Sequence, residues 1–109
     1  MWGRERDYRD ERERDQPPVD DMSLDELREE IRDVDRELVE LILRRTNVAV
    51  AIASVKQAEG RQTTDEAQEQ HVLDRARERA NDYDMDPERV ADVFEALIEL
   101  SKHTQNAQR

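Results

Sequence analysis

The sequence contains no cysteine and only two glycines, and four aromatic residues (one Trp, two Tyr, one Phe) are all it has. Without cysteine the chain forms neither disulfides nor thiolate metal sites. His71 and His103 have no partner at ligand spacing, so we expect no metal and no other cofactor. No apolar run is longer than residues 48–53, and the charged N-terminus lacks the apolar core of a signal peptide. We therefore expect a cytoplasmic protein without membrane contact.

Positive charge is also scarce, because 18 basic residues stand against 29 acidic ones and the net charge is −11. Such a surface repels the phosphates of nucleic acids and of anionic membranes, so neither is expected as a partner. Only Lys56 and Lys102 are lysines, and every other basic residue is an arginine. We interpret this acidic surface as an adaptation to high salt, since the Debye length falls to about 3 Å at 1 M salt and self-repulsion is screened.

Apolar residues between Ser23 and Gly60 recur at steps of three and four, which is the period of one helix face. Ser23 and Glu26 can form a capping box, no Pro or Gly interrupts residues 24–59, and Gly60 suits the end of a helix. About 35 residues give a helix of about 50 Å, more than a domain of this size covers by itself. We expect a partner chain to cover the stripe, which consists of Leu24, Leu27, Ile31, Val34, Leu38, Leu41, Arg45, Val48, Ile52 and Val55.

Two shorter helices are predicted after the long one. The first starts either from a Thr63–Glu66 capping box or from Asp65 as N-cap, and it ends near Asn81. The second starts at Pro87, after an Asp86 N-cap. Their predicted inward residues are Val72, Leu73, Ala76 and Ala80 in the first helix, and Val90, Val93, Phe94, Leu97 and Ile98 in the second.

The N-terminal segment differs from the rest of the chain. Residues 4–15 are almost entirely charged and contain no aliphatic residue, so they cannot build a core. Pro17 and Pro18 then disfavour a helical connection between this segment and the long helix. We expect a disordered tail over residues 1–18 and one all-α domain over residues 19–109.

Four polar residues interrupt the apolar stripes of the three helices: Arg45, Glu69, Ser101 and Gln105. Each alone is compatible with ordinary packing, for example by snorkelling or by an ion pair. Together they predict a polar pocket, because an unpaired buried polar group costs about 1 to 3 kcal/mol. Lys56 lies eleven residues after Arg45, on the same helix side and about 16 Å away, so the two cations can bracket a small anion.

Arg28 precedes Arg45 by seventeen residues, or about 25 Å along the helix, so it cannot reach the same small ligand. If two long helices pair in an antiparallel manner, however, Arg28 of one chain can enter the pocket of the other. The spacing thus favours a site shared between two chains.

These residues resemble the first helix of the all-helical chorismate mutases, in the run Leu27-Arg28, Ile31, Asp35, Leu38, Leu41, Arg45 and Lys56, and the resemblance extends over residues 24–105. It implies an intertwined helical homodimer that converts chorismate to prephenate in aromatic amino acid biosynthesis. The chain departs from the family at Gln68, where many members carry an arginine, so an auxiliary charge is missing. The substrate-binding residues implied by the resemblance are Arg45, Lys56, Asp65, Glu69, Ser101 and Gln105, with Arg28 from the partner.

The resemblance also implies roles for these residues. Arg28 and Arg45 would orient the two carboxylates of the substrate. Lys56 and Gln105 would be catalytic, since each would donate to the ether oxygen, where negative charge grows as the C–O bond breaks. Glu69 would accept from the substrate hydroxyl. Asp65 would support Glu69 in this contact, although a role as an ordinary helix N-cap explains an aspartate at position 65 equally well. Ser101 would bind a carboxylate of the substrate.

Two other functions remain open at this point. One is an isochorismate pyruvate-lyase on the same scaffold, which would use similar cations on a related substrate. The other is a non-catalytic helical dimerisation module, in which the inward polar residues only set the register of the helices.

Overall fold

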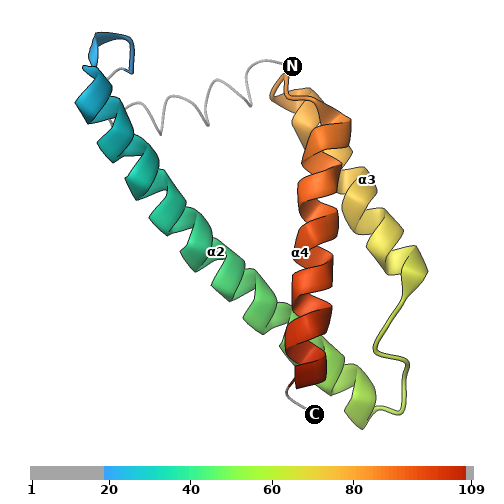
Figure 1. The fold of residues 1–109 in the computed structure, drawn as a ribbon. Helices are drawn as coiled ribbons and strands as arrows, with labels where there is room; N and C mark the ends of the chain where they lie inside the picture. The colour runs from blue at the N-terminus through green and yellow to red at the C-terminus, as the bar shows by residue number, and fades with distance from the viewer. Residues whose placement is uncertain (1–18, 108–109) are drawn as a thin grey trace. The chain divides into compact units, whose positions relative to one another are not determined.

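The computed structural model describes residues 19–107, so the predicted tail of residues 1–18 lies outside the described range. Within that range all regular secondary structure is helical and there is no strand, which confirms the predicted fold of one long and two shorter helices (Figure 1). None of the helices there is long and apolar enough to span a bilayer. The elements are the 3-10 helix η1 (Val19–Asp21) and the α-helices α2 (Leu24–Ala58), α3 (Glu66–Asp82) and α4 (Pro87–Ala107).

Both ends of α2 are fixed by local hydrogen bonds. At its start, Ser23 Oγ accepts from the Glu26 N–H at 3.1 Å, and Glu26 Oε1 accepts from the Ser23 N–H at 2.8 Å. This is the predicted capping box. At its end, Gly60 has a φ of 73°, and the Arg61 N–H donates to the Lys56 carbonyl at 2.8 Å. The chain thereby leaves the helix in a Schellman motif, and Lys56 is held in the last turn.

The starts of α3 and α4 are capped by aspartates. Asp65 Oδ1 accepts from the Gln68 N–H at 3.2 Å, so Asp65 is the N-cap of α3. Asp86 Oδ1 accepts from the backbone N–H of Glu88 at 3.0 Å, and Pro87 opens α4 as predicted. Of the two predicted start signals of α3, the structure therefore uses the aspartate.

The chain divides into two compact units, one up to Glu40 and one from Leu41 onward, and α2 contributes to both. In the second unit α3 and α4 lie side by side (Figure 1). Ala76 and Ala80 of α3 are buried together with Ala91 of α4, which lets the two helices approach closely. Arg77 of α3 also bonds to Glu88 of α4 at 3.2 Å.

The second half of α2 buries a different face from the one predicted. Thr46 and Ala53 are buried, and each comes one residue after a stripe position, a rotation of about 100°. Of the stripe residues in this half of the helix, Arg45 is half-buried and the other four are exposed, namely Leu41, Val48, Ile52 and Val55. Contact within the chain therefore leaves most of the stripe uncovered, and its burial by a partner stays a prediction.

The inward face of α4 was predicted too broadly. Val93 is 57% exposed within the chain, so its predicted inward orientation is wrong, and Ala91 is buried instead. Ala91 and Ser101 are ten residues apart and about 80° apart around the helix, and Phe94 and Ile98 lie half-buried on the face between them. Val93 lies about 100° away from Phe94 and so falls outside this face.

Candidate active site

A pocket of about 680 Å³ lies in the second unit, between the second half of α2, the start of α3 and the end of α4. The four polar residues that interrupt the helix stripes all line it: Arg45, Glu69, Ser101 and Gln105. Each helix contributes at least one of them. The structure thus brings together residues that are up to sixty positions apart in the sequence.

Arg45 and Ser101 are held by contacts with α4. The Arg45 guanidinium lies 5.8 Å from the centre of the Phe94 ring, a cation–π contact that restrains it at the pocket wall. Ser101 is buried, and its hydroxyl donates to the Leu97 carbonyl at 3.1 Å. To bind a carboxylate, this hydroxyl has to turn away from Leu97.

Glu69 is paired with a residue that the sequence pattern did not predict. Lys102 of α4 lines the same pocket, and its Nζ lies 2.9 Å from Glu69 Oε2 and 3.8 Å from Glu99 Oε2. The hydrogen bond with Glu69 raises the pKa of Lys102 above its ordinary value of 10.5, so the ammonium remains charged at neutral pH. One signal could have identified it, because Lys102 comes directly after the inward Ser101 and is one of only two lysines.

The charge of the pocket is opposite to that of the whole chain. Besides Arg45 and Lys102, Arg44 also lines the pocket, whereas Glu69 is its only acidic lining residue in the described range. Three cations against one anion favour a small ligand with two negative charges. Three further polar residues line the pocket and were not predicted to do so: Thr63, Thr64 and Gln68.

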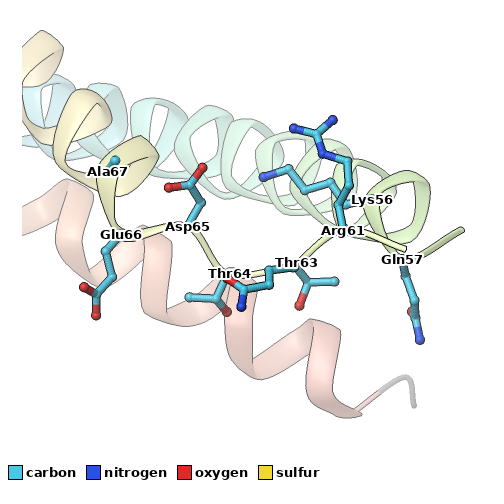
Figure 2. Close-up of a pocket in the computed structure, with 9 residues that line it drawn as sticks. Lys56, Gln57, Arg61, Thr63, Thr64, Asp65, Glu66 and Ala67 are labelled. Carbon is cyan, nitrogen blue, oxygen red and sulfur yellow. The ribbon is translucent and has the colours of Figure 1, made fainter. Parts of the chain in front are cut away.

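Lys56 and Asp65 line an adjoining pocket of about 1120 Å³ instead. Figure 2 shows the Lys56 side chain extending from the end of α2 along the loop toward Asp65, while Glu66 points away from both. The two pockets share Thr63 and Thr64, so this loop forms their common wall. That Lys56 and Gln105 bind the same substrate atom therefore stays a prediction.

Arg28 belongs to the first unit, whereas the pocket with Arg45 lies in the second. Its side chain is exposed and forms a long ion pair with Asp25 at 3.9 Å. Its role in a partner's pocket stays a prediction. Residues 19–107 also contain no cluster of three or more side chains that could hold a metal ion.

The fold and the pocket define a small all-helical protein with a cationic site for a small organic anion. Residues 27–106 match the family model of chorismate mutase type II, and the chain belongs to that family. It is 29% identical over 82 residues to the chorismate mutase of Methanocaldococcus jannaschii, an alignment that covers 75% of this chain and 83% of the relative. No solved structure matches the chain significantly. The chain is accordingly an isomerase of the chorismate mutase class, which confirms the resemblance seen in the sequence.

Proposed function

We propose that this chain rearranges chorismate to prephenate in the pocket between α2, α3 and α4. The observation that carries the proposal is that four polar residues from three helices line one cationic pocket: Arg45, Glu69, Ser101 and Gln105. The reaction breaks one C–O bond and forms one C–C bond within a single molecule, so it needs no nucleophile and no proton relay. The proposal includes a cytoplasmic location, in keeping with the biosynthetic role of the family.

The pocket would act by orientation and by electrostatic stabilisation. Arg45 would grip one carboxylate and favour the compact chair-like conformation, in which the reacting carbons are in contact. Gln105 would donate its amide N–H to the ether oxygen as negative charge grows there, which is typically worth about 10² to 10³ in rate per donor. Lys56 would supply a second donor, since its flexible four-carbon stem can extend past the shared loop.

The exposed apolar face of α2 supports the proposal that the active form is a homodimer. Its large side chains would leave a long stripe in water if the chain were a monomer. An interface with C2 symmetry would place the same face of two α2 helices together. In an antiparallel pair, Arg28 of each chain would then complete the pocket of the other. The exposed residues of this stripe are Leu24, Leu27, Ile31, Leu38, Leu41, Val48, Ile52 and Val55.

The test is an assay of the purified full chain with chorismate and, separately, with isochorismate, in which the products are identified. We expect chorismate to be consumed and prephenate to form, and we expect Arg45→Met to lower kcat/KM at least a hundredfold. Arg36→Met is the matched control, because Arg36 is an exposed arginine of α2 that forms a local ion pair with Asp33 at 3.3 Å. Faster pyruvate release from isochorismate would instead identify a lyase, and turnover of neither substrate would favour a dimerisation module.

A further inference from the structure

The ion pair between Lys102 and Glu69 connects two helices directly at the pocket. Lys102 Nζ bonds to Glu69 Oε2 at 2.9 Å, and both side chains line the pocket. The same ammonium lies 3.8 Å from Glu99 Oε2 on its own helix, which restrains it from a second side. Lys102 thus engages one oxygen of Glu69 and leaves Oε1 without a further ion pair in the described range.

This ion pair is poorly placed to stabilise the fold. The side chains of Lys102 and Glu69 are 33% and 28% exposed, and ion pairs with this much solvent contact add little to folding stability. Arg77 and Glu88 form a second ion pair between the same two helices at 3.2 Å, where Arg77 is 32% exposed. Attachment of α3 to α4 therefore does not depend on Lys102, and its location at the pocket points to a role in the site.

We propose that Lys102 is a positioning residue for substrate recognition, which holds the Glu69 carboxylate so that Oε1 faces the substrate. The inference rests on the proposed function, in which Glu69 accepts from the substrate hydroxyl. A carboxylate fixed through one oxygen presents the other in a defined direction and loses little freedom when substrate binds.

The charge of Lys102 has a second consequence for a ligand with two carboxylates. Without the ammonium, Glu69 would carry an uncompensated negative charge in the pocket and would repel the substrate. With it, the pair is neutral, and the surplus positive charge of Arg44 and Arg45 remains for the carboxylates. Orientation and charge compensation both act through Glu69, so removal of the Glu69 charge should remove the need for Lys102.

The test is a double-mutant cycle on chorismate turnover by the full chain, with Lys102→Met, Glu69→Gln and the double variant. We expect Lys102→Met to lower kcat/KM about tenfold and Lys102→Arg to restore most of it, since a guanidinium can also bond the carboxylate. In the Glu69→Gln background, Lys102→Met should have less than a twofold effect. Arg77→Met is the matched control, because it breaks the other ion pair between α3 and α4 outside the pocket and should leave kcat/KM within twofold.

Three results would overturn the inference. Lys102→Met could lower kcat/KM no more than Arg77→Met does, which would make the Lys102–Glu69 ion pair structural. Lys102→Met could lower kcat/KM by the same factor in the Glu69→Gln background as in the wild type, which would mean that Lys102 does not act through Glu69. The same conclusion would follow if Lys102→Arg failed to restore activity. Failure of the proposed function is distinguishable from these, because the wild-type chain would then convert no chorismate or Glu69→Gln would retain the full rate.

Discussion

The shared site predicts that two inactive variants restore activity when they are combined. Arg28 and Arg45 lie on one continuous helix, about 25 Å apart by helix rise, so a small substrate cannot contact both in the same chain. If each pocket takes Arg45 from one chain and Arg28 from the other, every pocket of an Arg28→Ala or an Arg45→Ala homodimer lacks one guanidinium. Both homodimers should then be nearly inactive.

The size of the restored activity can be worked out by counting pockets. Refolding equal amounts of the two variants together gives about half mixed dimers by random pairing in a C2 dimer. In each mixed dimer one pocket carries both defects, and the other has an intact Arg28 and an intact Arg45. One good pocket in two, in half of the dimers, predicts about a quarter of the wild-type rate.

The assay is chorismate consumption, measured on samples in which native mass spectrometry shows the mixed dimer. Arg45→Ala mixed with Glu69→Ala is the matched control, because both residues line the same pocket of one chain and every pocket of the mixed dimer keeps one defect. That mixture should stay inactive. If the Arg28 and Arg45 variants also stay inactive together while mixed dimers are present, the shared-site reasoning is wrong and Arg28 is a surface residue.

Three other perturbations test the donor at the ether oxygen, the ligand class and the tail. Gln105→Glu should lose activity near neutral pH and regain it toward acid, because a carboxyl group donates to the ether oxygen only when protonated; a flat pH profile of kcat/KM would show that Gln105 does not contact that oxygen. A dicarboxylate that resembles chorismate should stabilise the chain against thermal unfolding, by about 2.7 kcal/mol at one hundred times its Kd, and an absence of any shift would favour the dimerisation module. Deletion of residues 1–18 should leave the dimer and the turnover nearly unchanged, and loss of the dimer in size-exclusion chromatography would contradict this.

The helix ends could be predicted from the sequence because their causes are local. Ser23 and Glu26 exchange hydrogen bonds across three residues, and Gly60 ends α2 through its own backbone conformation. Asp65 and Asp86 likewise cap helices that start directly after them. Such signals do not depend on where the rest of the chain packs.

The buried faces were harder to predict because they depend on what each helix packs against. The stripe of α2 has a regular period, yet contact within the chain uses Thr46 and Ala53, on a neighbouring face. Val93 has the apolar character of a core residue but lies on the exposed side of α4. Periodicity shows that a helix has an apolar face, whereas packing decides which part of it the same chain covers.

The candidate site was predicted in part. Polar residues on apolar stripes identified Arg45 and Glu69, because a polar group at such a position needs a partner. Lys102 was not identified in this way, because a lysine on an acidic helix is common at a protein surface. Only the packing of α3 against α4 brings Lys102 to Glu69. Lys56 lines the adjoining pocket together with the loop after Gly60, and helix spacing alone does not reveal the path of that loop.

The central claim is that the pocket between α2, α3 and α4 binds the transition state, and a crystal structure with a stable dicarboxylate mimic of the chair-like transition state tests it most directly. We expect one mimic per chain, with a carboxylate on Arg45 and the Gln105 amide about 2.7 to 3.1 Å from the ether oxygen. A mimic bound instead in the neighbouring pocket of about 320 Å³, which shares Arg45 but is lined by Arg75 and Arg79 and not by Gln105, would contradict the claim.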